Sequence, residues 1–224
     1  MQKGLSMSSY NNMSLFGTGT TSALKRFFDI VVSFAMLVVL SPVLLIFAVV
    51  SAVSTKSFPI FVQARMGKNN KAFNVFKFRT MRADTPSDVA TAELADADSY
   101  ITRVGGLMRR YSIDELPQIA NILFGQMSFV GPRPVVVTET NLVELRTRNG
   151  ACSVRPGLTG LAQISGRDFV NDHEKAKMDA FYAANLSISM DFRLLVQTLL
   201  YVVNAEDIHE GRRNGPDGTA EPSM

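Results

Sequence analysis

The sequence predicts an α+β protein, mostly helical, in which a re-entrant N-terminal membrane helix carries one compact domain with short strands and interfacial amphipathic helices. Three observations favour this class. The 224 residues suffice for one ordinary domain but not for two independent ones. The hydrophobic residues, 46% of the chain, are concentrated near the N-terminus. In the remainder, helical periodicity recurs between Gly and Pro signals, and alternating patterns are confined to short segments.

The membrane helix is predicted over residues 23–55. It follows a Ser-, Asn- and Gly-rich stretch, residues 1–22, that we expect to be a disordered tail. Phe27 to Val53 is almost continuously apolar and exceeds the ~20 residues that cross a bilayer as a helix. A secretory signal peptide is the alternative. Its apolar core would hold only ~7–15 residues, which favours the membrane helix.

Basic residues flank this apolar segment on both sides. Lys25 and Arg26 precede it, and three more follow it, namely Lys56, Arg65 and Lys68. Because basic flanks tend to stay on the cytosolic side, neither end of the segment is expected to cross the bilayer.

A helix break is predicted at Ser41 and Pro42, in the middle of the segment. Proline removes a backbone hydrogen bond from a helix, and the Ser41 hydroxyl can bond a carbonyl group that the break frees. A bent helix that enters and leaves by the same face satisfies both the break and the basic flanks. An ordinary kinked helix that spans the membrane is the alternative.

The domain after the membrane helix is expected to occupy residues 56–205, followed by a disordered tail over 206–224. Gly and Pro signals separate its helices, which are predicted over 103–110, 115–124, 137–148 and 171–185. Residues 84–100, which are acidic and rich in Ala and Ser, read as a surface loop or a short helix. The apolar stretch between Phe192 and Val203 is too short to span a bilayer and is either a core helix or one lying in the membrane interface.

A strand is predicted from Phe73 to Met81, where apolar and basic residues alternate. Lys77 and Arg79 would share one face of this strand, and neighbouring phenylalanines would share the other. Such a strand would direct two cations at one ligand.

The candidate catalytic residues are Asp114 and Glu115, which follow two arginines closely. Ser112 and Glu115 have capping-box spacing and Pro117 suits a first helical turn, so both carboxylates are expected at a helix start, where the dipole favours their ionised form. Such a pair can supply a nucleophile and bind a hard divalent cation such as Mg²⁺. Acidic residues in a first helical turn are also ordinary helix stabilisers, which is the structural alternative.

Two later loops are suited to bind phosphate. Gly131-Pro132-Arg133-Pro134 fixes the backbone on both sides of Arg133. Residues 155–160 bring together Arg155, two glycines and the hydroxyl of Thr159, as a loop that holds an anion would. Taken alone, each loop also reads as an ordinary turn. The Walker and Rossmann glycine patterns are absent from the sequence.

Composition excludes several classes of protein. A single cysteine, Cys152, rules out an internal disulfide framework and a multi-cysteine zinc site. The two histidines, His173 and His209, have no neighbouring ligand pattern. The formal charge is only +3, but grouped Lys and Arg residues leave basic surfaces for phosphates or anionic lipid. We expect no nucleic-acid partner.

The motifs above occur in the order seen in bacterial sugar transferases. Residues 22–205 resemble the monotopic polyprenyl-phosphate phosphoglycosyl transferases in their minimal form. The six motifs that carry this resemblance are Lys25-Arg26-x-x-Asp29, Ser41-Pro42, Phe76-Lys77-Phe78-Arg79-Thr80-Met81, Asp114-Glu115-Leu116-Pro117-Gln118, Gly131-Pro132-Arg133-Pro134 and Arg155-Pro156-Gly157-Leu158-Thr159-Gly160.

The resemblance implies transfer of a sugar 1-phosphate from a UDP-sugar to undecaprenyl phosphate, the first membrane step of exopolysaccharide or other glycoconjugate synthesis. The reaction would take place at the cytosolic face of the bacterial inner membrane, and downstream glycosyltransferases are expected as partners. Asp114 would attack the sugar-bearing phosphate, and Glu115 together with Asp114 would bind Mg²⁺. Phosphate or nucleotide contacts are expected for Lys77, Arg79, Arg109, Arg133, Arg155 and Thr159, and lipid headgroup contacts for Lys25 and Arg26.

Two other functions fit the same residues. One is a membrane-anchored phosphohydrolase, in which water resolves the intermediate on Asp114. The other is a non-catalytic anchored adaptor of a polysaccharide assembly complex. The sequence specifies neither the oligomeric state nor the sugar, for which the resemblance implies galactose, glucose or an acetamido sugar.

Overall fold

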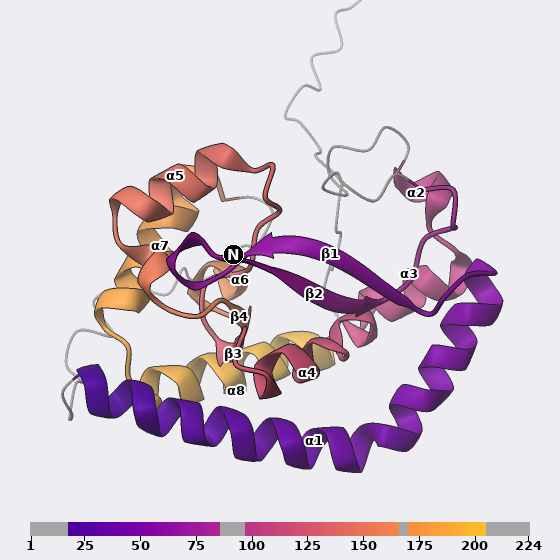
Figure 1. Ribbon diagram of the computed structural model, residues 1–224, viewed down its shortest axis with the longest axis horizontal. Coiled ribbons are helices and arrows are strands. Elements are labelled where there is room, and N and C mark those ends of the chain that lie inside the picture. The colour runs from indigo at the N-terminus through magenta and orange to yellow at the C-terminus, as the bar shows by residue number, and fades with distance from the viewer. Residues whose placement is uncertain (1–17, 86–96, 166–169, 205–224) are drawn as a thin grey trace, which may run out of the picture.

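The computed structural model describes residues 18–85, 97–165 and 170–204 (Figure 1). Most of the two predicted tails and of the acidic stretch over 84–100 therefore lies outside the described residues. In chain order the elements are α1 (Thr18–Thr55), β1 (Ile60–Met66), η2 (Lys68–Asn70), β2 (Ala72–Phe78), α2 (Ala97–Tyr100), α3 (Arg103–Arg110), η4 (Ile113–Glu115), α4 (Gln118–Leu123), β3 (Ser128–Val130), α5 (Thr140–Arg148), η5 (Ala151–Ser153), β4 (Gly157–Thr159), α6 (Leu161–Ile164), α7 (Asp172–Ala184) and α8 (Ile188–Asn204).

The described chain is mostly helical with a few short strands and one long apolar N-terminal helix, which confirms that part of the predicted class. The re-entrant path of that helix stays a prediction. The helix predicted over 103–110 forms with both of its predicted ends, and the one over 171–185 forms as α7, which Asn171 caps by accepting a hydrogen bond from the Glu174 N–H. The helix predicted over 137–148 begins later, at Thr140. α1 begins at Thr18, earlier than the expected residue 23.

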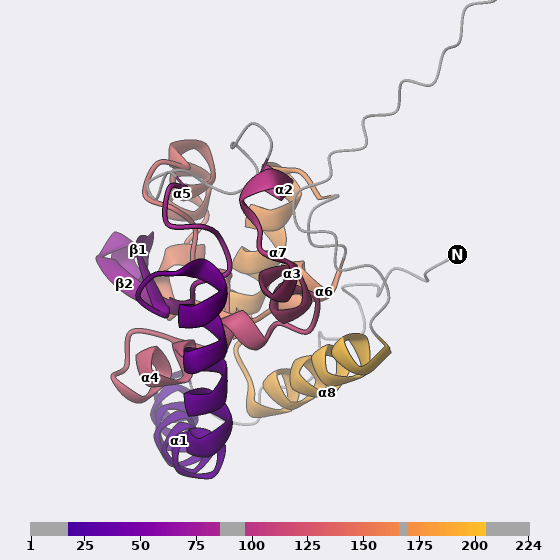
Figure 2. The ribbon, with the colours of Figure 1, turned by 90° about the vertical axis from the view of Figure 1, so that its right-hand side faces the viewer.

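The long helix α1 bends, so that it lies along two sides of the domain (Figures 1 and 2). Pro42 lies inside it, and the Ser41 hydroxyl donates a hydrogen bond of 2.8 Å to the Val38 carbonyl oxygen. That carbonyl is the one whose usual partner would be the backbone N–H at position 42, which proline lacks. The predicted role of Ser41 at the break is therefore confirmed.

α1 buries polar side chains and exposes apolar ones. Ser33 and Ser51 have no exposed surface, whereas Val39 and Leu45 are 73% and 67% exposed. Helices of water-soluble domains show the opposite arrangement, with the apolar stripe facing the core. With a mean hydropathy of 2.8, Thr20–Thr55 is long and apolar enough to cross a membrane. α1 therefore associates the protein with a membrane.

Two small sheets connect the helices. β1 and β2 form an antiparallel hairpin, and β3 pairs with β4 in parallel. The segments around Gly131 and Gly157 lie so close together that a Cβ atom at Gly157 would stand 2.1 Å from the Gly131 nitrogen. Glycine at these positions thus permits the two loops of the predicted phosphate motifs to pack backbone against backbone.

The side chain of Asn121, fully buried on α4, bonds to the free edge of β2. Its amide oxygen accepts from the Phe76 N–H at 3.0 Å, and its amide nitrogen donates to the Asn74 carbonyl oxygen at 2.7 Å and to Gln126 Oε1 at 2.7 Å. The side chain thereby takes the place of a neighbouring strand. It fixes α4, which directly follows Asp114 and Glu115, against the strand that carries Lys77.

Replacing Asn121 with Ala should destabilise the fold strongly. Three hydrogen bonds are lost and two backbone groups of β2 lose their partner, so the free energy of unfolding should fall by about 3 kcal/mol. The thermal midpoint in detergent should fall by about 6–12 °C. Asn141→Ala is the matched control, because it removes one exposed hydrogen bond to Asp172. Equal thermal midpoints for the two variants would contradict the role of Asn121 in holding α4 against β2.

The apolar stretch near the C-terminus forms α8, which has two faces. Met190 and Leu194 pack into a core cluster with Val130 and Tyr182. The opposite face is exposed and consists of Phe192, Leu195, Val196, Leu199 and Leu200. The core interpretation holds for the first face, and an interfacial position of the second face stays a prediction.

Candidate active site

Asp114 and Glu115 lie in η4, a short 3₁₀ turn that leads into α4. The predicted capping box is wrong. Ser112 adopts a left-handed conformation with φ of 54° and makes no side-chain cap, and its backbone N–H donates to the Arg109 carbonyl oxygen instead. Glu115 does not reach back because its carboxylate meets two cations from elsewhere in the fold. Asp114 and Glu115 are each 6% exposed.

The Glu115 carboxylate joins two of the predicted phosphate-binding residues. Its Oε1 atom lies 2.8 Å from Lys77 Nζ and 2.9 Å from Arg133 Nη2. Lys77 comes from β2 and Arg133 from the loop after β3, so three separate parts of the chain converge here. The two cations thus lie against the carboxylate of the residue that directly follows Asp114.

Arg109, another predicted phosphate ligand, lies in the last turn of α3, shortly before η4. Its Nε donates to the Thr80 hydroxyl at 2.8 Å, while its Nη1 is buried and has no hydrogen-bond partner among the described residues. A buried guanidinium nitrogen without an acceptor is costly, and a phosphate oxygen is the acceptor it suits best. Arg109 Nη1 is therefore suited to donate a hydrogen bond to a bound anion.

The loop that carries Arg133 is held by its neighbours at each successive carbonyl group. Four hydrogen bonds reach its carbonyl oxygens: Gly157 N–H donates to Pro132 O, Arg146 Nη1 to Arg133 O, Arg65 Nη1 to Pro134 O, and Met66 N–H to Val135 O. A segment with two prolines has few N–H groups of its own, so other parts of the chain supply these bonds. The Arg133 backbone is therefore fixed before any ligand arrives.

Arg146 is itself held by a buried acid. Its Nη2 lies 2.6 Å from Asp179 Oδ2, and the two side chains are 10% and 2% exposed. Burial raises the pKa of Asp179, and the Arg146 charge opposes that rise. The pair links α5 and α7 and directs one remaining Arg146 nitrogen at the carbonyl oxygen of Arg133.

The other predicted phosphate ligands have different hydrogen-bond partners. Arg79 lies beyond the end of β2, donates to the Phe58 carbonyl oxygen and stands 5.7 Å from the Phe61 ring centre. Arg155 donates to the Gly125 carbonyl oxygen at 2.8 Å. The Thr159 hydroxyl lies 2.6 Å from that of Thr198 on α8.

The two basic residues expected at lipid headgroups both bond to the domain. Lys25 Nζ lies 2.5 Å from Asp191 Oδ2, and Arg26 donates to the Ile122 and Leu123 carbonyl oxygens at the end of α4. Burial and the neighbouring Asp191 carboxylate raise the pKa of Tyr182, whose hydroxyl lies 2.7 Å from Asp191 Oδ1. These contacts join the N-terminal part of α1 to the domain, and a headgroup contact stays a prediction.

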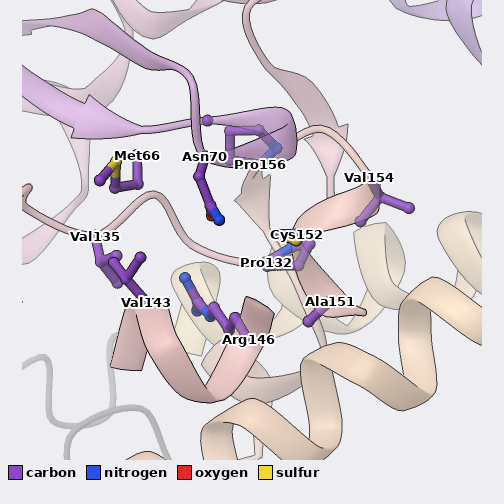
Figure 3. Close-up of a pocket in the computed structure, with 11 residues that line it drawn as sticks. Met66, Asn70, Pro132, Val135, Val143, Arg146, Ala151, Cys152, Val154 and Pro156 are labelled. Atoms are coloured by element: carbon purple, nitrogen blue, oxygen red, sulfur yellow. The ribbon is translucent and has the colours of Figure 1, made fainter. Parts of the chain in front are cut away.

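A small pocket lies behind the Arg133 loop, between the β1–β2 hairpin and α5 (Figure 3). Its volume is about 30 Å³, and its lining includes Pro132, Arg146 and Cys152. Such a space holds one or two water molecules and is too small for a sugar nucleotide. It is a packing feature of the support behind Arg133.

The carboxylate pair fits one mode of magnesium binding. Among the described residues, no group of three or more His, Cys, Asp or Glu side chains is placed to hold a metal. Mg²⁺ commonly takes only one or two protein carboxylates and completes its shell with substrate phosphates and water. Asp114 and Glu115 are the residues that would hold it in this way.

Sequence reasoning missed three residues that support the site, namely Thr80, Asn121 and Arg146. Thr80 and Asn121 stand inside or next to recognised motifs, but their partners are 29 and 45 residues away. Arg146 lies in a helix with no motif at all. Only the tertiary contacts reveal these three roles.

The fold combines an exposed apolar helix with a pair of carboxylates and with Lys and Arg side chains that suit phosphate. This combination is typical of a membrane-associated enzyme that acts on phosphate groups. The comparison with known proteins gives the family. The sequence profile described as bacterial sugar transferase matches residues 20–205. The chain therefore belongs to the bacterial sugar transferase family.

Several curated relatives have similar sequences. The exopolysaccharide production protein PSS of Rhizobium leguminosarum bv. phaseoli is 40% identical over 79% of this chain and 94% of its own length. The exopolysaccharide production protein ExoY of Sinorhizobium fredii is 36% identical over 78% and 83%. The UDP-glucose:undecaprenyl-phosphate glucose-1-phosphate transferase of Klebsiella pneumoniae is 37% identical over 81% of this chain but only 40% of its own length.

Proposed function

We propose that this protein transfers a sugar 1-phosphate from a UDP-sugar to undecaprenyl phosphate through a covalent intermediate on Asp114. The observation that carries the proposal is the Glu115 carboxylate held by Lys77 and Arg133, with Asp114 next to it and the unpartnered Arg109 Nη1 nearby. The named activity of the Klebsiella relative supports the donor and the acceptor. The site residues supply what phosphoryl transfer needs, which is positioning and charge neutralisation.

In the first displacement, an Asp114 carboxylate oxygen attacks the sugar-bearing phosphorus. A bond forms between that oxygen and phosphorus, and the bond from phosphorus to the bridging oxygen of the diphosphate breaks. The bridging oxygen leaves with its electron pair on uridine monophosphate. Arg109 and Arg133 stabilise the negative charge that grows on the phosphoryl oxygens, and Lys77 keeps Glu115 in place.

In the second displacement, an oxygen of the lipid phosphate attacks the same phosphorus. The bond between Asp114 and phosphorus breaks, the carboxylate is regenerated and a lipid diphosphate sugar is released. Splitting the reaction in two lets a water-soluble donor and a membrane-bound acceptor use one nucleophile in turn. Bound Mg²⁺ would neutralise part of the diphosphate charge.

We further propose that α1 enters and leaves the bilayer by the cytosolic face. Near its start, Lys25 and Arg26 bond to the domain, and near its end Ser51 Oγ donates to the Arg79 carbonyl oxygen at 2.7 Å. Both ends of α1 therefore contact one domain. Its 38 residues would measure about 54–57 Å if straight, well beyond the ~30 Å hydrocarbon core. The exposed apolar face of α8 would lie in the interface beside it.

Cysteine labelling should show both ends of α1 on one side of the membrane. In a Cys152→Ser background, Thr20→Cys and Lys56→Cys are each expected to react with a membrane-impermeant maleimide in inverted vesicles and to stay unlabelled in intact spheroplasts. Thr20 and Lys56 are both exposed, so access within the protein does not limit the reaction. Labelling of the two positions from opposite sides would contradict the re-entrant path.

An isotope exchange assay tests the covalent intermediate without lipid. The purified protein is incubated with Mg²⁺, a panel of UDP-sugars and labelled uridine monophosphate. Label should enter a UDP-sugar because the first displacement is reversible. If label entered none of the UDP-sugars, the two-step transferase would be contradicted. Release of sugar phosphate in place of exchange would indicate the phosphohydrolase. The sugar that exchanges fastest identifies the donor.

A further inference from the structure

A cavity of about 310 Å³ lies beside the N-terminal part of α1. α1 contributes Ser22, Lys25 and Asp29 to its lining, and the rest of the domain contributes Lys68, Ser153 and Arg155 among others. Arg155 is the one predicted phosphate ligand in this lining, which does not include Lys77, Arg109, Asp114, Glu115 or Arg133. The cavity is therefore a separate space from the candidate active site.

The charges around this cavity do not balance. Lys25, Lys68 and Arg155 carry three positive charges, and Asp29 carries one negative charge. The Asp29 Oδ1 atom already accepts from the Ser128 hydroxyl and the Phe129 N–H. When Asp191, the partner of Lys25, is counted as well, one positive charge remains in excess.

A fourth cation stands next to Arg155. Arg155 Nε donates to the Gly125 carbonyl oxygen, and Arg26 Nη2 lies 3.1 Å from the position that a Cβ atom of Gly125 would take. Two guanidinium groups thus lie against one glycine. Like charges close to each other repel, and an anion bound in the cavity beside Arg155 would relieve that repulsion.

We propose that this cavity is a second phosphate-binding site, which takes a phosphate monoester or diester through Lys68 and Arg155. Lysine, arginine and serine side chains are donors that phosphate oxygens accept from readily. The volume exceeds that of several water molecules and leaves room for the group esterified to the phosphate. Because Lys25 lies at the start of the apolar segment, the cavity would stand near the lipid headgroups in the membrane orientation proposed above. The phosphate belongs either to an anionic lipid or to a soluble compound.

Thermal unfolding of the full chain in detergent tests the site with two probes. Dihexanoylphosphatidylglycerol represents the lipid source and inorganic pyrophosphate the soluble source, and both are titrated in the presence of a chelator. A ligand that binds only the folded state raises the unfolding midpoint, and the titration gives an apparent Kd. Dihexanoylphosphatidylcholine, which has no net charge, controls for detergent effects.

Lys68→Gln is the test variant and Lys71→Gln its matched control. Both lysines are exposed and flank the same hairpin turn, but only Lys68 lines the cavity. Lys68→Gln should weaken binding of the effective probe about three- to fivefold, and Lys71→Gln should leave it unchanged. Arg155→Lys should bind more weakly than the native chain while it keeps its charge, because it loses the planar donor pair.

The outcomes decide both the site and its ligand. Selective stabilisation by the phosphatidylglycerol probe assigns the cavity to lipid, and selective stabilisation by pyrophosphate assigns it to a soluble compound. No stabilisation by either probe, or an equal loss in Lys68→Gln and Lys71→Gln, would overturn the proposal. If binding were weakened only in Arg133→Gln, the probe would bind at the candidate active site, and the proposal of a second site would be overturned. Because no readout requires turnover, failure here is distinguishable from failure of the proposed transferase reaction.

Discussion

Asp114→Asn is expected to abolish exchange of labelled uridine monophosphate into the UDP-sugar, with a loss of more than about a thousandfold. The amide is isosteric with the carboxylate but is a very poor nucleophile towards phosphorus, so the first displacement cannot begin. The fold should persist, because Glu115 keeps its contacts with Lys77 and Arg133. Exchange is measured without lipid, and folding by the thermal midpoint.

A matched control for this variant is Asp84→Asn, which alters an exposed carboxylate that pairs with Arg82. It should leave exchange unchanged. If Asp114→Asn kept its exchange rate, Asp114 would not be the nucleophile, and Glu115 would become the carboxylate to test.

Arg146→Met should have the largest effect on stability. It leaves the Asp179 carboxylate buried without its partner, which costs about 3–5 kcal/mol in the free energy of unfolding. For a chain of this size, the thermal midpoint should fall by about 6–20 °C. The Arg133 carbonyl group also loses its donor, so the loop that holds the phosphate-binding arginine loosens.

A double variant separates stability from positioning. Arg146→Met combined with Asp179→Leu replaces the buried ion pair by apolar side chains, and should recover most of the lost stability. It cannot restore the bond to the Arg133 carbonyl oxygen, so the KM for the UDP-sugar should stay raised by about five- to tenfold while kcat changes less. A double variant with the native KM would make Arg146 a purely structural residue.

Local signals explain which elements the sequence predicts well. α3 begins at the predicted residue and α7 one residue after it, because Thr102 and Asn171 cap their N-termini through side-chain bonds to residues three positions later. The helix break is equally local, since Ser41 bonds the carbonyl group of Val38. Such contacts span three or four residues and leave a readable pattern in the sequence.

Contacts between distant segments explain what the sequence missed. The capping box failed because Glu115 pairs with Lys77, 38 positions earlier, and with Arg133, 18 positions later. Arg155 and Thr159 belong to a recognised motif, yet the described bonds of Arg155 lead to Gly125 and those of Thr159 to Thr198. A linear pattern shows which residues can bind phosphate but not which of them meet.

The attachment of α1 at two points sets different evolutionary constraints on its length and on its composition. Apolar residues between the attachments, such as Val39 and Leu45, can be exchanged for other apolar residues, since they touch little of the protein. A single inserted residue between Ser33 and Ser51 would turn one attachment about 100° away from its partners. Related chains should therefore tolerate substitution along this helix while they reject insertions and deletions.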